Sequence, residues 1–153
     1  MPSWCERTAA EASGVVRSIM NLGLARCYSK TIDGMNKISW APPTNEDFAA
    51  IVGLGEAGVS PLARYLDLDE KDGFTQLLAV KFLIAINKPS VLRPLERATA
   101  ADQWEVSRAQ ALDGLFQISK SDARTFVDSA LHDPSPLMRR HAEELIRFYA
   151  EAR

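Results

Sequence analysis

Hydrophobic residues along most of the chain recur at intervals of three and four positions, which is the spacing of one face of an α-helix. Polar turns rich in glycine, proline and asparagine separate these stretches. Thr44 is followed by Glu46 and Asp47, a pattern typical of a helix N-cap with an acidic first turn. The pattern predicts an all-α protein, with helices over residues 3–28, 45–52, 61–66, 74–86, 90–98, 104–118, 122–131 and 137–150.

The N-terminal part follows a different pattern from the rest of the chain. Residues 29–43 combine glycine, asparagine and two prolines, which predicts an irregular loop. Trp40 in this loop is either an exposed anchor for a partner or a cover for the open end of the helical stack, and we favour the cover. We therefore expect a single domain in which residues 1–43 form an N-terminal helix and irregular loop that cap residues 44–153.

The three longest helices of residues 44–153 repeat one pattern. Offsets of 32 and then 31 residues align their first apolar residues, Phe74, Val106 and Leu137. The same alignment gives three further columns, which are Gln76, Arg108 and Arg139; Ala79, Ala111 and Ala142; and Leu83, Leu115 and Ile146. A small residue in the middle of a helix lets the neighbouring helix approach closely. Since one such unit cannot bury its apolar faces alone, we expect the units to stack into a solenoid.

This pattern resembles the HEAT-repeat family in its short bacterial-type form, over about residues 44–150. The resemblance is carried by the Val-Ser-Arg-Ala-Gln-Ala-Leu of residues 106–112, the Leu-Gly corner at residues 54–58, and the last unit with Asp133-Pro134-Ser135-Pro136, Arg139, Ala142 and Leu145. It implies a short right-handed α-solenoid of stacked helical hairpins. It also implies structural contacts between repeats for Asp133, Arg108 and Arg139. The first unit departs from the family, because it has Gln76 where arginine is usual.

The charge balance argues against a nucleic-acid partner. The chain has 18 basic and 20 acidic residues and a formal net charge of −2, whereas proteins that bind phosphate backbones usually carry a basic excess. No apolar run approaches the roughly 20 residues that span a bilayer, and the N-terminus lacks the pattern of a secretory signal. The two cysteines fit a reducing compartment. We therefore expect a cytoplasmic protein that does not enter a membrane.

Residues 53–58, Gly-Leu-Gly-Glu-Ala-Gly, match the G-x-G-x-x-G fingerprint of dinucleotide sites. The apolar residues before this segment have helical spacing, and no alternation of strand and helix follows it. A Rossmann site needs a strand–turn–helix context. The segment is therefore better explained as a glycine-rich corner between two helices.

Other chemical motifs are equally weak. His132 and His141 are the only histidines, and His141 lacks the second histidine that a zinc-protease motif needs four residues later. His141 is expected to be half-buried in packing, and Trp104 to lie in the core. The acidic run 67–72 has no glutamate at the closing position of a calcium loop. We expect no cofactor, no bound metal and no catalytic residue.

The longer helices of a HEAT-like stack usually line its concave face, and the resemblance therefore implies that a partner binds there. The expected protein-binding residues are Lys81, Gln110, Asp113, Gln117, Arg140, Glu144 and Arg147, with Trp40 in the loop. Their mixed charges suit a polar protein partner. We expect a non-enzymatic module that acts as an adaptor, a regulator or an immunity-type inhibitor. A nucleic-acid-binding or DNA-base-acting enzyme on the same scaffold, and a subunit of a larger assembly such as a lyase, are the alternatives.

Overall fold

The computed structural model describes residues 11–20, 31–32, 35–36, 43–67 and 73–151. This part of the chain is almost entirely helical, as the sequence predicted. After residues 11–20, the helices are α2 (Asn45–Leu54), α3 (Val59–Ala63), α4 (Gly73–Ile86), α5 (Leu92–Ala98), α6 (Glu105–Ile118), α7 (Lys120–Ala130) and α8 (Pro136–Glu151). Short 3₁₀ turns cover Gly55–Gly58, Arg64–Leu66 and Pro89–Val91.

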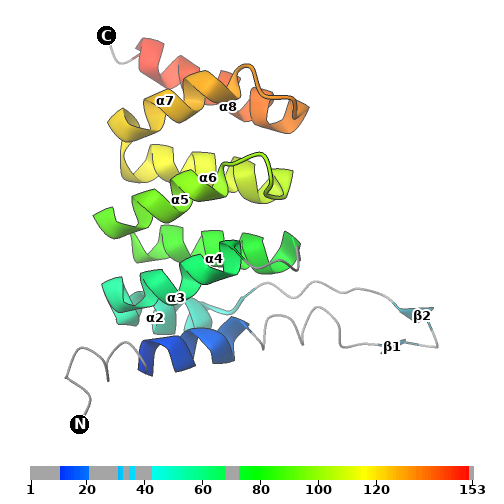
Figure 1. Ribbon diagram of the computed structural model, residues 1–153, viewed down its shortest axis with the longest axis vertical. Coiled ribbons are helices and arrows are strands. Elements are labelled where there is room, and N and C mark those ends of the chain that lie inside the picture. The colour runs from blue at the N-terminus through cyan, green and yellow to red at the C-terminus, as the bar shows by residue number, and fades with distance from the viewer. Residues whose placement is uncertain (1–10, 21–30, 33–34, 37–42, 68–72, 152–153) are drawn as a thin grey trace.

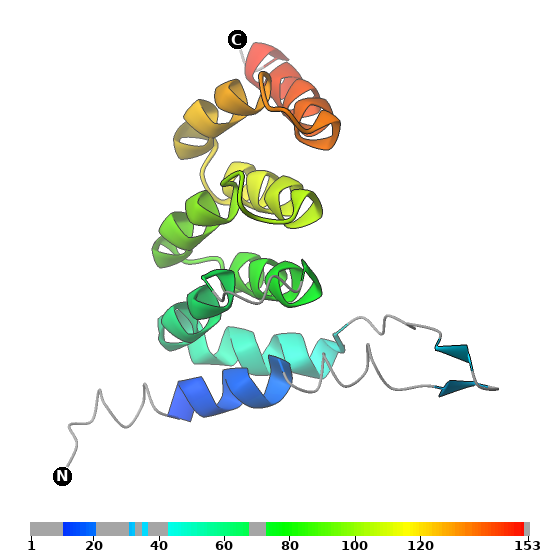
Figure 2. The same ribbon diagram turned by 45° about the vertical axis from the view of Figure 1, so that its right-hand side comes forward.

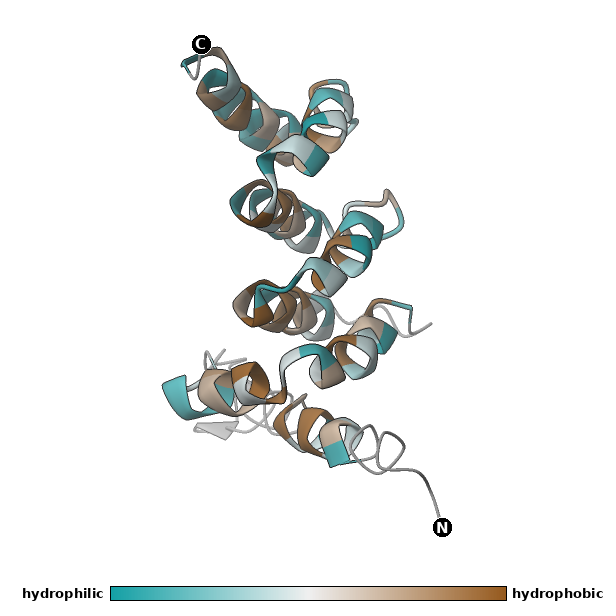
Figure 3. Cartoon of the chain, turned by 90° about the vertical axis from the view of Figure 1, so that its left-hand side faces the viewer, coloured by the Kyte–Doolittle hydropathy of each residue, from teal (hydrophilic) through white to brown (hydrophobic). Residues whose placement is uncertain are grey.

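The helices pack as consecutive antiparallel pairs that lie one above another (Figure 1). Figure 2 shows α3, α5 and α7 in one column and α4, α6 and α8 in a second column beside it. Helix α6 contacts α4 below it, α8 above it, and both α5 and α7 in the first column. Figure 3 shows hydrophobic and hydrophilic residues mixed along the helices, and α4 is mostly hydrophobic. The core is therefore one continuous apolar cluster that runs through the stack.

The described residues of the N-terminal part form a helical segment and two short paired strands. Residues 11–20 are helical and lie at the end of the stack beside α2 (Figure 2). Val16 and Met20 from this segment are buried in the same core cluster as Ile51 of α2. In the region that the sequence predicted as irregular loop, β1 (Thr31–Ile32) and β2 (Met35–Asn36) pair as antiparallel strands. Trp40 lies outside the described residues.

Local chemistry explains where the helices begin and end. Thr44 and Asp47 form a reciprocal capping box at the start of α2, in which the Asp47 amide donates to Thr44 Oγ1 and the Thr44 amide to Asp47 Oδ2. Helix α2 is capped at its C-terminal end by Gly55, whose φ of 56° is a conformation that favours glycine. The sequence placed the start of α3 at Pro61, but the helix begins at Val59. Proline is tolerated in the first turn of a helix, because its missing N–H has no partner there.

The predicted column of small residues is buried at every level. Ala79, Ala111 and Ala142 have no exposed surface. A further small residue, Gly114, brings α6 even closer to α4, because an added Cβ would lie 2.5 Å from side-chain carbons of Ile84. Small side chains on α6 therefore set how closely neighbouring helices of the second column approach each other.

Side-chain hydrogen bonds and an ion pair join each pair of helices to the next pair in the stack. The side-chain amide of Gln103 donates through Nε2 to the Leu66 carbonyl at 3.0 Å. The backbone amide of Trp104 donates to Gln76 Oε1 at 3.2 Å. One layer further along, Arg108 makes a two-point ion pair with Asp133, and one of its two contacts measures 3.1 Å. Gln76 thus occupies the position of Arg108 in the repeat and also contacts the segment that precedes the next long helix.

A charge placed in the alanine column should unfold the stack. We expect Ala111→Asp to lower the free energy of unfolding by about 3–5 kcal/mol, because it buries a carboxylate with no partner. Chemical denaturation followed by circular dichroism measures this change. Ala49→Asp is the matched control, since Ala49 is exposed on α2, and it should change stability by less than about 0.5 kcal/mol. Equal effects of the two substitutions would show that the alanine column does not hold the layers together.

Candidate functional site

Seven of the eight residues that the sequence singled out lie on α4, α6 and α8, and the eighth, Trp40, lies outside the described residues. We call the surface that carries these seven residues the α4–α6–α8 face and define it by Lys81, Gln110, Asp113, Gln117, Arg140, Glu144 and Arg147. Gln117, Arg140, Glu144 and Arg147 are exposed, whereas Lys81, Gln110 and Asp113 are partly buried. Helical spacing places the members from each helix in one row, and contacts between α4, α6 and α8 bring the rows side by side.

At the centre of this face a histidine pairs with an aspartate. His141 Nδ1 of α8 lies 3.2 Å from the Asp113 carboxylate of α6, and both side chains are about 30% exposed. Burial raises the pKa of the Asp113 carboxyl above its usual value, although the hydrogen bond from His141 acts in the opposite direction. Nearby Glu144 also raises it. The sequence predicted a half-buried His141 but gave no sign of its partner, because the two residues are 28 positions apart.

Aromatic side chains gather at the C-terminal end of the face. The Phe116 ring of α6 lies 5.6 Å from the ring of Phe148 and 5.5 Å from that of Tyr149, both on α8. Phe148 remains 53% exposed, so the cluster is open to solvent. Lys120 lies over the Phe116 ring at 5.4 Å. This end of the face therefore exposes aromatic surface beside a positive charge.

The start of α6 adds a second exposed apolar group. Val106 is 36% exposed, and it lies in the same helical row as Gln110, Asp113 and Gln117. Trp104 was predicted to lie in the core, but it is 39% exposed. Its ring packs at 5.8 Å from Phe74 and covers Gly73, where an added Cβ would lie 2.7 Å from the indole. The tryptophan thus covers the start of α4 instead of entering the core.

The glycine motif does not form a dinucleotide site in the described structure. Gly53 and Leu54 end α2, and Gly55–Gly58 form the 3₁₀ turn that leads directly into α3. No strand precedes the glycines, because residues 45–54 are helical. A Cβ added at Gly58 would lie 3.3 Å from Leu54 Cβ, a tight contact that favours a small residue at this corner. The segment is a connection between two helices, as predicted.

Arg108, Asp133 and Arg139 form a structural network away from the solvent side of the α4–α6–α8 face. Arg108 Nε donates to the Thr99 carbonyl at 2.9 Å while its two terminal nitrogens contact Asp133. The Arg139 guanidinium donates to the Asp133 carbonyl at 2.6 Å. The guanidinium of Arg108 holds the pKa of the Asp133 carboxyl below its usual value. These contacts join α6 to the turn before α8, which is the kind of role that the resemblance implied for the three residues.

Neither a metal centre nor a membrane span occurs in the part of the chain that the structure describes. No three histidine, cysteine, aspartate or glutamate side chains there are grouped closely enough to hold a metal ion. Within the same residues, none of the helices combines the length and the apolar character needed to cross a bilayer.

Comparison with known proteins adds no relative to this picture. No protein-family model matches the chain, and searches of curated proteins and of solved structures likewise found no match. Functional assignment therefore depends on the geometry and chemistry described above.

Breaking the Arg108–Asp133 pair should cost much more stability than breaking an exposed ion pair. We expect Asp133→Ala to lower the free energy of unfolding by about 3 kcal/mol, because it leaves a buried guanidinium unpaired. Asp128→Ala is the matched control, since it breaks the exposed pair with Arg124 on α7 and should cost about 0.5 kcal/mol. Urea denaturation of both variants provides the comparison. Similar losses of stability in the two variants would contradict the conclusion that Asp133 stabilises the fold by pairing with buried Arg108.

The same pair predicts a dependence of stability on pH. The folded-state pKa of Asp133 is lowered, so its contribution is fully present above the unfolded-state value of 3.8 and is lost as pH falls towards the folded-state pKa. The difference in unfolding free energy between the natural chain and Asp133→Ala should therefore stay constant from about pH 7 to about pH 5 and shrink in more acidic solution. Urea denaturation at several pH values measures this. A difference that grows with acidification would contradict the ion pair.

Proposed function

We propose that this protein is a non-enzymatic module that binds another protein through its α4–α6–α8 face. We further infer that the stack is a short right-handed α-solenoid of the HEAT type, with this face on its concave side. Two observations support that inference. The helices pair and stack in two columns, and the repeated alanines are buried at each level.

The main support for protein binding is that one continuous face combines exposed apolar groups with charges of both signs. Phe148 and Val106 are exposed at its two ends, and Arg140, Glu144 and Arg147 lie exposed on α8. Protein interfaces typically place aromatic anchors within a polar, charged rim. The charges of both signs fit a partner with complementary charges, which would fix its orientation.

The acidic members distinguish this face from a groove for nucleic acid. Asp113 and Glu144 lie near each other on the same face as the basic Arg140 and Arg147. A phosphate backbone requires several basic contacts and tolerates few carboxylates near them. The partner that we propose is therefore a polar protein surface, and the module acts as an adaptor, a regulator or an immunity-type inhibitor. Its two cysteines suit the reducing cytoplasm.

Site-specific photo-crosslinking in the native cell tests the proposed face. A photoreactive phenylalanine analogue at Gln117 and, separately, at Glu144 should crosslink to the same protein, because both positions lie exposed on the face. The matched control places the analogue at Thr125, which is exposed on α7 in the other column. A protein that crosslinks from Thr125 as strongly as from Gln117 would contradict the assignment of the face. A nucleic-acid adduct would support the alternative class.

Removal of the exposed aromatic should weaken the complex with the crosslinked partner. We expect Phe148→Ala to lower affinity at least tenfold, which corresponds to about 1.4 kcal/mol, when measured by calorimetric titration. Thr125→Ala should leave affinity unchanged. Thermal unfolding of the variant separates a loss of binding from a loss of fold, since the Phe148 ring also contacts Phe116. Unchanged affinity for folded Phe148→Ala would exclude the aromatic cluster from the interface.

A further inference from the structure

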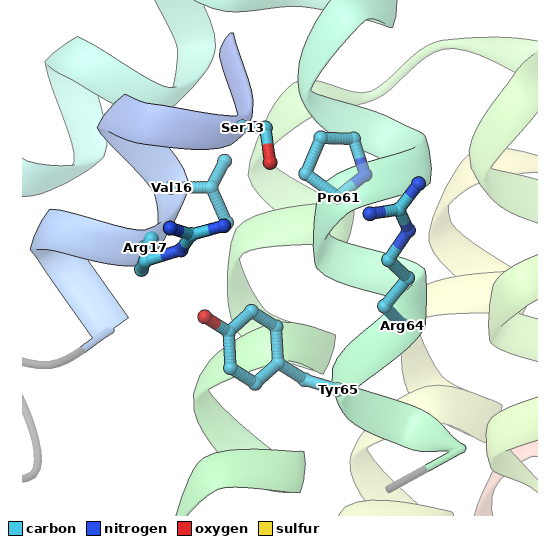
Figure 4. A pocket seen from close by; sticks show the side chains of 6 residues that line it. All are labelled: Ser13, Val16, Arg17, Pro61, Arg64 and Tyr65. Carbon is cyan, nitrogen blue, oxygen red and sulfur yellow. The ribbon is translucent and has the colours of Figure 1, made fainter. Parts of the chain in front are cut away.

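A pocket outside the α4–α6–α8 face lies between the helical segment 11–20 and α3. It encloses about 200 Å³ and is lined by Ser13, Val16, Arg17, Pro61, Arg64 and Tyr65. Figure 4 shows that Ser13, Val16 and Arg17 come from the N-terminal helix, while the other three come from α3 and the turn after it. The pocket thus exists only because the N-terminal helix packs on the end of the stack.

The pocket is rich in hydrogen-bond donors. The guanidinium groups of Arg17 and Arg64 lie on opposite sides of it, and the Ser13 side chain points into the space between them (Figure 4). The Tyr65 hydroxyl adds a further polar group on the side of Arg17. Among the residues that the structure describes, no carboxylate lines the pocket. Two guanidinium groups therefore face one small space, and none of the other described lining residues neutralises them.

Neither arginine is neutralised elsewhere in the described structure. The ion pairs found among the described residues involve Arg97, Arg108, Arg124 and His141, and neither Arg17 nor Arg64 takes part in one. Both arginines are exposed residues, so a ligand can reach their guanidinium groups from solvent. An anion between these two positive charges would be attracted to both of them.

The remaining lining is apolar. Val16 is buried and forms part of the core, and the Pro61 ring and the Tyr65 ring complete the wall. A bare inorganic anion would leave this apolar surface without a partner. A ligand with both an anionic head and a small apolar body would satisfy the two parts of the lining together.

We propose that this pocket binds the phosphate group of a small organic phosphate monoester. A phosphate monoester carries nearly two negative charges at neutral pH and three acceptor oxygens, so it can accept from two arginines on different sides. A carboxylate has one charge and two oxygens in one plane, which a single guanidinium fork already satisfies. The ester group then packs against Val16, Pro61 and Tyr65. The phosphate comes either from a free small molecule or from a phosphorylated side chain.

Calorimetric titration of the full chain with phenyl phosphate tests the site. We expect saturable binding at submillimolar concentration, and Arg17→Gln or Arg64→Gln should each weaken it at least tenfold. Arg93→Gln is the matched control, because Arg93 is exposed on α5 away from the lining, and it should bind as the natural chain does. Binding that survives Arg17→Gln and Arg64→Gln, or no saturable binding at millimolar concentration, would overturn the proposal.

Three comparison ligands test the chemistry of the head group. Benzoate, which offers a carboxylate on the same ring, should bind at least tenfold more weakly than phenyl phosphate. Inorganic phosphate should also bind more weakly, since it cannot use the apolar wall. Phenyl phosphate affinity should fall as pH drops below about 6, where the ester loses its second charge. Benzoate binding as tight as phenyl phosphate would overturn the assignment of a phosphate monoester.

A phosphoserine peptide distinguishes the two sources of the phosphate. If the peptide binds more tightly than phenyl phosphate and Arg17→Gln abolishes the difference, the ligand is a phosphorylated side chain. If phenyl phosphate binds more tightly, the ligand is a free phosphate ester. Thermal unfolding of Arg17→Gln and Arg64→Gln should match that of the natural chain, because neither arginine is buried. The outcome is independent of whether the α4–α6–α8 face binds a protein.

Discussion

The close approach of α6 to its neighbours is the constraint on which the rest of the structure depends. Ala111 and Gly114 keep the middle of this helix narrow, so that α4 and α8 can pack on either side of it. Helices α5 and α7 of the other column pack against α6 and complete the burial of its apolar side chains. Interiors packed at crystal-like density tolerate little change in volume at such contacts. The position of every residue on the α4–α6–α8 face follows from this packing.

Polar contacts complement the apolar packing by fixing the register between layers. Arg108 is buried and contacts the Thr99 carbonyl and Asp133 together, which satisfies most of its donors in one place. In the preceding layer Gln76 reaches the Trp104 amide with a neutral group instead. The substitution of glutamine for the arginine of the repeat is therefore accommodated without a buried unpaired charge. This explains how an irregular repeat can still stack.

The sequence predicted the helices well and the chemistry of the surface only in part. Apolar spacing placed α4 and α6 to within one residue, because their buried faces follow the helical period. The buried alanines were found from the repeat alone. The exposed position of Trp104 was not predicted, because an aromatic residue at a helix start gives no sign of which side it covers. The pairing of His141 with Asp113 was also missed, since it depends on the rotation of α8 against α6.

The pocket beside α3 is the clearest example of a site that the pattern of residues along the sequence does not predict. Arg17 and Arg64 lie 47 positions apart, in segments whose polar faces look like ordinary solvated surface. They meet only because Val16 and Met20 bury the N-terminal helix against the stack. Total composition hides this local excess of positive charge, because the chain as a whole has a net charge of −2. Net charge describes solubility and long-range attraction, whereas recognition depends on which charges the fold brings together. A chain with almost no net charge can therefore carry charges of both signs on the α4–α6–α8 face. At the N-terminal end of the stack it can also hold a pocket rich in hydrogen-bond donors.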